Sequence, residues 1–166
     1  IHSEKFNFKG HTEYLKSKAG AEEVLMFMIS ENMRIGFVTG HLPLKKVPEA
    51  ITHDLLMKKI RIMNKSLIID FAIRKPKIAV LGLNPHAGDN SLLGTEEAEV
   101  IIPAIAQAEK EGILAFGPFP ADGFFGAGSF SKFDGILSMY HDQGLPPFKA
   151  LSFDSGVNYT AGLPFI

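Results

Sequence analysis

Three histidines in this chain are placed where they could hold a metal ion together. Each follows a short apolar run with the length and composition of a buried strand, and the runs are residues 35–39, 78–83 and 135–139. If these strands are parallel, their carboxyl ends meet at one edge of a sheet, which would bring His41, His86 and His141 to that edge. Three imidazoles without a nearby cysteine suit a divalent metal with an open coordination position. The alternative is that each histidine is simply a polar residue at the end of a strand.

The pattern between these runs predicts alternating helices and strands. Helices are expected over residues 12–20, 48–75 and 95–112, and further strands over 23–29 and 113–116. Thr12 is expected to be the N-cap of the first helix. The first two strands resemble a hairpin, so we expect a mixed, largely parallel sheet in an α/β architecture with layers α/β/α.

Two segments rich in glycine, proline or phenylalanine are expected to be irregular. The residues after His141 predict a turn, and they are Gly144, Pro146 and Pro147. Residues 117–131 predict a flexible loop over the site. Within it, residues 126–128 (GAG) lack the third glycine and the preceding strand of a dinucleotide fingerprint, so they are not interpreted as one.

Composition sets the broad class. The chain has 166 residues, 46% hydrophobic and 21% charged, which suits one domain with its own core. The net charge of -1 gives no support for a nucleic-acid or membrane-surface partner. The absence of cysteine rules out disulfides and thiolate metal sites. Because the sequence starts at Ile1 and stops in an apolar run, we expect it to be a fragment of a longer, two-domain protein.

Six short motifs, in order along the chain, carry a resemblance to a known family. They are residues 10–13 (GHTE), 41–44 (HLPL), 83–88 (LNPHAG), 140–145 (YHDQGL), 156–158 (GVN) and 162–165 (GLPF). Together they resemble the 4-hydroxythreonine-4-phosphate dehydrogenases, the PdxA family of pyridoxal phosphate synthesis, and the match is to the central part of the family sequence. The resemblance implies a fold like that of isocitrate and isopropylmalate dehydrogenases. It also implies a cytoplasmic homodimer whose active sites lie at the subunit interface.

The resemblance also assigns roles to individual residues. His41, His86 and His141 become metal ligands shared between two subunits. The implied substrate contacts are His11, Thr12, Lys149 and Asn158. The plainer alternatives are that Thr12 is a helix cap, Lys149 a solvated cation and Asn158 a turn residue. The family also has an arginine substrate contact just after the position of Ile166.

The implied reaction is oxidation of 4-phosphooxy-L-threonine, a phosphorylated hydroxy amino acid, by NAD or NADP, followed by loss of carbon dioxide. A divalent metal (Zn, Mg or Co) would assist both steps. Asp142 and Asp122 are expected to orient ligand histidines or to relay the alcohol proton, and the alternative for Asp122 is a turn residue. Gly40 and residues 89–93 depart from the commoner family pattern, which leaves the preferred substrate open. One alternative is a dehydrogenase of D-erythronate or D-threonate 4-phosphate. An alternative from another class is a non-catalytic metal- or phosphate-binding module.

Overall fold

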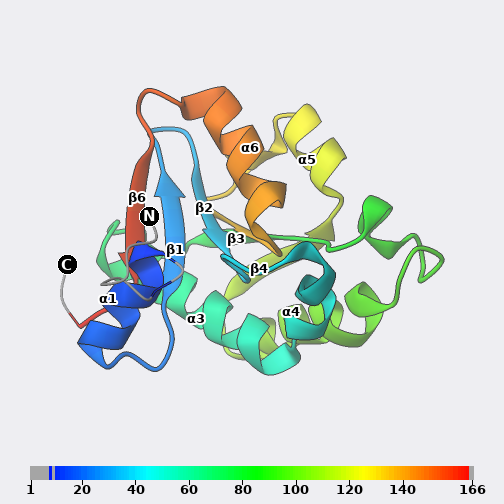
Figure 1. Ribbon diagram of the computed structural model, residues 1–166. Coiled ribbons are helices and arrows are strands. Elements are labelled where there is room, and N and C mark those ends of the chain that lie inside the picture. The colour runs from blue at the N-terminus through cyan, green and yellow to red at the C-terminus, as the bar shows by residue number, and fades with distance from the viewer. Residues whose placement is uncertain (1–7, 9, 165–166) are drawn as a thin grey trace.

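Four neighbouring parallel strands form the part of the sheet that ends at the histidines. In the computed structural model, which describes residues 8 and 10–164, the strands are β1 (Leu25–Ile29), β2 (Arg34–Phe37), β3 (Lys77–Leu81), β4 (Leu114–Phe119), β5 (Gly135–Ser138) and β6 (Val157–Ala161). Their order in the sheet is β4-β3-β5-β2-β1-β6 (Figure 1). β4, β3, β5 and β2 are parallel, whereas β1 is antiparallel to both β2 and β6. The sheet is therefore mixed and largely parallel, and the predicted hairpin is confirmed.

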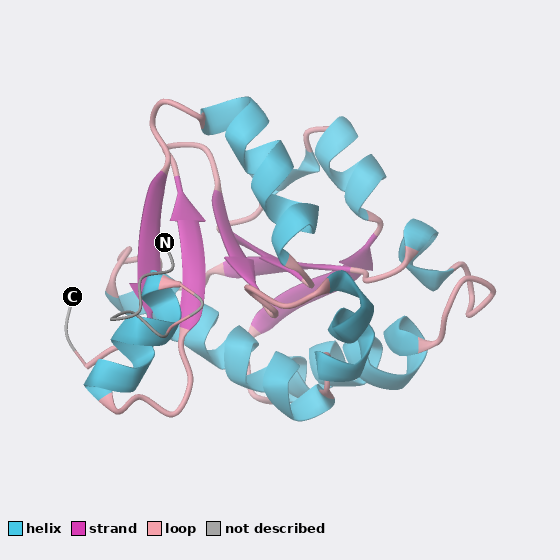
Figure 2. Cartoon of the chain, in the orientation of Figure 1, coloured by secondary structure: helices cyan, strands magenta, loops and turns pink. Residues whose placement is uncertain are grey.

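Helices cover both faces of this sheet, as the α/β/α prediction requires (Figure 2). The α-helices are α1 (His11–Ala19), α2 (Val47–Ala50), α3 (His53–Ile69), α4 (Ile102–Lys110), α5 (Ala121–Gly126) and α6 (His141–Ser152). Shorter helical turns are η1 (Leu44–Lys46), η2 (Pro85–Gly88), η3 (Glu97–Ile101) and η4 (Ser129–Lys132). Within the described part of the chain, none of the helices has the length and apolar character needed to cross a bilayer.

The alternating side chains of the strands divide the core into two layers. In β3, Ile78 and Val80 belong to the apolar cluster that includes α3 and α4, whereas Ala79 and Leu81 belong to the cluster that includes α5 and α6. All four side chains are fully buried. Such burial on both faces is what favours a continuous apolar strand over an alternating one.

The long helix predicted over residues 48–75 is in fact two helices. α2 ends at Ala50, and Ile51 is extended (φ −80°, ψ 94°). Thr52 then caps α3, because its side chain accepts a hydrogen bond from the Leu55 amide at 3.2 Å. The N-cap hydrogen bond satisfies an amide that the break between the two helices leaves without a helical partner. The apolar stripe runs across this break, so the sequence pattern gave no sign of it.

Thr12 is not an N-cap, contrary to the prediction. It is the second residue of α1, and the N-cap position is taken by Gly10, whose backbone is extended (φ −168°). Gly10 is also where the chain passes close to His41, so a side chain is disfavoured there. The predicted end of α1 is confirmed, since Gly20 adopts the left-handed conformation (φ 62°) after the last turn.

The turn predicted after His141 is wrong, because α6 runs through it. A Cβ atom on Gly144 would lie 2.7 Å from Ile35 Cδ1 and 2.8 Å from Ser138 Oγ, so glycine here allows the helix to lie close to the sheet. Two prolines lie within α6, and burial of Leu145 and Phe148 against the sheet offsets the backbone hydrogen bonds they remove.

The flexible loop predicted over residues 117–131 is also wrong. This segment contains the end of β4, then α5 and η4. Phe124 is buried, and its ring lies 5.3 Å from that of Phe119 and 5.7 Å from that of Phe133. Packing of aromatic rings therefore orders a segment whose glycines suggested flexibility.

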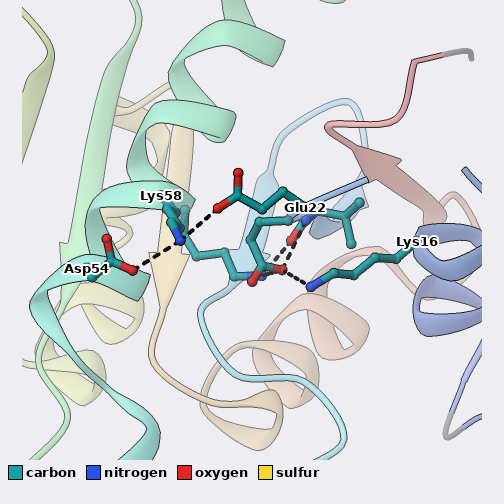
Figure 3. A network of polar contacts seen from close by, with 7 residues as sticks. Lys16, Glu22, Asp54 and Lys58 are labelled. Carbon is teal, nitrogen blue, oxygen red and sulfur yellow. Dashed lines mark hydrogen bonds and ion pairs between the residues drawn. The ribbon is translucent and has the colours of Figure 1, made fainter. Parts of the chain in front are cut away.

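α1 is attached to the rest of the chain in part by ion pairs, and none of its residues is fully buried. Lys16 Nζ lies 3.0 Å from Glu23 Oε1, and Lys59 Nζ lies 3.1 Å from the same oxygen. Lys59 is buried, which lowers the pKa of its ammonium group although Glu23 acts in the opposite direction. Glu22 and Lys58, which precede Glu23 and Lys59 in the sequence, form a second and more exposed ion pair. Lys58 also contacts Asp54 (Figure 3).

Candidate active site

Two of the predicted metal ligands lie side by side at the carboxyl ends of β2 and β5. Beyond the strands, the pairing continues: the Val38 amide donates to the Ser138 carbonyl at 2.8 Å, and the Thr39 amide donates to the Met139 carbonyl at 3.1 Å. This register carries both chains to the same level of the edge. The rings of His41 and His141 have centroids 5.7 Å apart.

Each of these histidines has a carboxylate against its Nδ1 atom. His41 Nδ1 lies 3.2 Å from Glu13 Oε1, and His141 Nδ1 lies 2.6 Å from Asp142 Oδ1. A carboxylate that accepts a hydrogen bond from Nδ1 favours the tautomer with the proton on Nδ1. In that tautomer Nε2 carries a lone pair that can coordinate a metal. The arrangement leaves the Nε2 atoms of both rings unprotonated, and it places Asp142 against His141, the kind of contact on which its predicted role depends.

Glu13 is a residue that the sequence interpretation did not assign to the site. It lies in the first turn of α1, next to the predicted substrate residues His11 and Thr12. A Cβ atom on Gly10 would lie 2.6 Å from His41 Cε1 and 2.8 Å from Glu13 Oε2, so the start of α1 is pressed against the histidine. The structure thus brings the GHTE segment to His41. In the sequence, the one sign of a contact between Glu13 and His41 was the presence of an acidic residue in this motif.

His86 follows β3, the strand on the other side of β5, but it lies in a segment that projects from the body of the chain (green in Figure 1). Residues 86–91 all have positive φ, from 42° at Asp89 to 83° at Gly88. This left-handed conformation costs roughly 1–2 kcal/mol for each residue other than glycine. Within the described ranges, no group of three or more histidine, aspartate or glutamate side chains is close enough to hold a metal ion.

Two hollows adjoin along the edge of the sheet. The first, of about 570 Å³, is lined by His86, Asp122 and Asp142 among others. The second, of about 480 Å³, is lined by His41, His141 and again Asp142. Tyr140 also lines both hollows. Asp142 therefore faces the surroundings of all three histidines, and Asp122 shares a hollow with His86.

Gln143 connects the two strand ends that precede His86 and His141. Its Oε1 accepts a hydrogen bond from the Met139 amide at 2.7 Å, and its Nε2 donates to the Gly82 carbonyl. The side chain thus fixes the ends of β5 and β3 relative to each other. The sequence interpretation quoted Gln143 within a motif but gave it no role.

Lys149 and Asn158 do not line either hollow. Lys149 is exposed on α6, and its backbone lies about 12 Å further along the helix than His141, at 1.5 Å per residue. Asn158 is exposed on β6 and pairs with Met28, which in turn pairs with Ile35 near the start of β2. Asn158 therefore lies towards the amino ends of the parallel strands, whereas the histidines leave their carboxyl ends.

Known proteins share both the fold of this chain and much of its sequence. The family model described as pyridoxal phosphate biosynthetic protein PdxA matches residues 1–166. A 4-hydroxythreonine-4-phosphate dehydrogenase of Bacteroides thetaiotaomicron is 52% identical over 167 residues, which cover 100% of this chain and 46% of that protein. One of Neisseria meningitidis serogroup A is 50% identical over 96% of this chain and 48% of that protein. The chain spans about half the length of the curated relatives it matches.

A solved structure shows the same architecture. The crystal structure of 4-hydroxythreonine-4-phosphate dehydrogenase from Klebsiella pneumoniae aligns with a TM-score of 0.87 and 36% identity, covering 96% of this chain and 48% of that one. Fold, motif order and the family model agree. The chain therefore belongs to the PdxA family.

Proposed function

We propose that the full-length protein containing this chain is an NAD(P)-dependent dehydrogenase that oxidises 4-phosphooxy-L-threonine with decarboxylation. The observation that carries the proposal is the pair of carboxylate-oriented histidines, His41 with Glu13 and His141 with Asp142, at the strand ends of a PdxA-family chain. Relatives of this chain are named for this activity. The reaction belongs to pyridoxal phosphate biosynthesis, which is the description of the family.

The proposal includes a divalent metal held by His41, His86 and His141. The donor set fits such an ion, because neutral imidazoles are common ligands of zinc and related metals. When bound, the ion supplies Lewis acidity that lowers the pKa of the substrate hydroxyl and stabilises the enolate left by decarboxylation. Glu13 and Asp142 hold the Nδ1 protons of two ligands, and Asp122 is placed to relay a proton within the hollow that it shares with His86.

The metal site is proposed to be shared by two copies in a homodimer. His41 and His141 lie together in one chain, whereas His86 is on a projecting segment whose Leu92 is 77% exposed. Leu93 beside it is 41% exposed, and neighbouring exposed apolar side chains on a projecting segment suit contact with another protein surface. In this arrangement one copy supplies His41 and His141, and the partner copy supplies His86.

The proposed substrate contacts are the four residues to which the family resemblance assigns that role. Lys149 is proposed to pair with the phosphate or carboxylate of the substrate as a point charge. Asn158 supplies an amide donor, and His11 and Thr12 flank Glu13 at the start of α1. Because Lys149 and Asn158 lie away from the histidines of their own chain, a site that uses both groups also favours assembly from two copies.

The test is a substrate comparison with the purified full-length protein. Reduction of NAD and of NADP is followed by absorbance with Zn²⁺, Mg²⁺ or Co²⁺ and with 4-phosphooxy-L-threonine, D-erythronate 4-phosphate or D-threonate 4-phosphate. The highest kcat/KM should be found with 4-phosphooxy-L-threonine. A preference for either sugar-acid phosphate would change the substrate assignment, and binding without turnover of all three would indicate a non-catalytic module.

Mixed dimers test the sharing of the site. Copies carrying His86→Ala and copies carrying His141→Ala should each be inactive alone. In a mixed dimer, one site would receive His41 and His141 from the first copy and His86 from the second, and would be intact. Recovery of activity on mixing is therefore expected, and its absence in verified mixed dimers would argue for a site within one chain.

A further inference from the structure

A buried carboxylate lies inside the segment that carries His86. Glu97, the first residue of η3, is only 3% exposed. Its Oε1 accepts hydrogen bonds from the amides of Leu83 and Asn84, each at 2.7 Å, and its Oε2 accepts one from Asn84 Nδ2 at 3.0 Å. Both oxygens are thus engaged by the segment between β3 and His86, and the carboxylate has no access to a reacting group.

Two glycines make room for this carboxylate. A Cβ atom on Gly82 would lie 3.1 Å from Glu97 Oε1, and one on Gly88 would lie 2.8 Å from Glu97 Oε2. The backbone therefore approaches Glu97 from both sides of His86. Such close packing of a charged group is stable only when its hydrogen bonds are made, as they are here.

The backbone beside this carboxylate is in an unfavourable conformation. His86, Ala87, Asp89, Asn90 and Ser91 all have positive φ without being glycine. Asp89 and Asn90 are of types that tolerate this conformation, whereas His86 and Ala87 keep it only when surrounding contacts determine it. Glu97 supplies those contacts at the start of the segment, where Leu83 and Asn84 precede the first left-handed residue.

We propose that Glu97 is the positioning residue for His86: its carboxylate holds the left-handed segment 86–91 in the one conformation that presents the imidazole for metal binding. The role in metal binding rests on the function proposed above, whereas the role in holding the segment can be measured without any metal. Glu97 is not a ligand in this account and acts only through His86.

The first test measures the segment itself. Amide hydrogen exchange over residues 83–91 is compared between the full-length protein and its Glu97→Ala variant, without added metal. Faster exchange at Leu83 and Asn84 is expected, with a smaller effect in Glu97→Gln, which keeps one acceptor oxygen. Thr52→Ala is the matched control, because it removes a helix cap at α3 and destabilises the protein without touching this segment. Unchanged exchange at residues 83–91 in Glu97→Ala would overturn the proposal.

The second test measures Zn²⁺ affinity by competition with a chelator. Loss of a contact that orients a ligand typically lowers metal affinity 10–100-fold, so about that loss is expected in Glu97→Ala and none in Thr52→Ala. The double variant Glu97→Ala/His86→Ala should bind no more weakly than His86→Ala alone, because both changes act through one imidazole. If His86→Ala weakens binding but Glu97→Ala does not, the positioning role is refuted while the metal assignment stands. If His86→Ala has no effect, the metal assignment fails, and the exchange experiment alone decides the role of Glu97.

Discussion

The rings of His41 and His141 lie 5.7 Å apart because the ends of β2 and β5 remain paired beyond both strands. Thr39 strengthens this pairing, since its side-chain hydroxyl donates to the Met139 carbonyl at 2.7 Å. Two parallel strands in register therefore do what no local motif could do. They bring imidazoles from distant parts of the sequence to one place, each with its own carboxylate partner.

Replacement of Glu13 by glutamine should weaken metal binding. The variant keeps the size of the side chain but removes the charge that stabilises the Nδ1 proton of His41. We expect Zn²⁺ affinity to fall about 10–100-fold, as for other contacts that orient a ligand histidine. Competition with a chelator measures the change, and Glu31→Gln, at an exposed position, is the control. Equal affinities of the two variants would show that Glu13 does not orient the ligand.

Gly144→Ala should destabilise the protein by about 1–3 kcal/mol, the usual cost of overpacking. The new methyl group would lie 2.7 Å from Ile35 Cδ1 and 3.0 Å from Phe37 Cε1, and α6 would have to move away from the sheet. Gly123→Ala is the matched control, because it also lies in an α-helix and its Cβ atom would meet nothing within 4 Å. Denaturant unfolding should show a loss for Gly144→Ala and no loss for Gly123→Ala. A reversed order would refute the close approach of α6.

Two adjacent glutamates should differ in their contribution to stability. Glu23→Gln leaves the buried Lys59 ammonium without its charged partner, and we expect a loss of about 3 kcal/mol. Glu22→Gln removes only the contact with Lys58, in which the Glu22 side chain is 85% exposed, and solvent screening makes the contribution of such a pair small. The free energies of unfolding of the two variants, measured in parallel, check the difference. Similar losses would mean that the Glu23–Lys59 pair is effectively solvated.

The carboxyl group of Glu111 should titrate at unusually low pH. Hydrogen bonds from Arg61, at 2.8 and 2.6 Å, and from Gln107 lower its pKa from 4.5 to about 2. A lowered carboxyl pKa stabilises the fold above about pH 4.5, and this contribution is lost as the pH falls through about 2. An NMR titration of the side-chain carboxyl should show the low midpoint, and Arg61→Gln should move it back towards 4.5. A midpoint near 4.5 in the unsubstituted protein would contradict the ion pair.

The strands and the edge that carries the histidines could be predicted from the sequence because burial on both faces leaves a plain apolar signal. Ile78 to Leu81 of β3 are fully buried, and all four residues of β5 are buried as well. The break at Thr52 could not be predicted in the same way, because the apolar stripe of α3 extends the pattern of α2. A single hydrogen bond to the Leu55 amide decides that boundary.

Other features depend on contacts between segments that are far apart in the sequence. Gly144 has the local chemistry of a turn, but close packing against Ile35 places it in a helix. The pairing of Glu13 with His41 and the burial of Glu97 beneath the segment of His86 are likewise tertiary contacts. Sequence patterns pointed to the three histidines and to Asp142, whereas the roles of Glu13, Glu97 and the amide of Gln143 became visible only in the fold.

The ion pair between Lys16 and Glu23 makes the attachment of α1 sensitive to ionic strength. Lys16 binds Glu23, and the rest of the helix has no fully buried side chain. Added salt shortens the screening length from about 10 Å at 0.1 M to about 3 Å at 1 M, and it leaves apolar packing largely intact. The helix that begins with His11 and Thr12 is thus held in part by an ion pair that salt weakens, whereas the sheet beneath it is held by apolar packing that salt leaves largely intact.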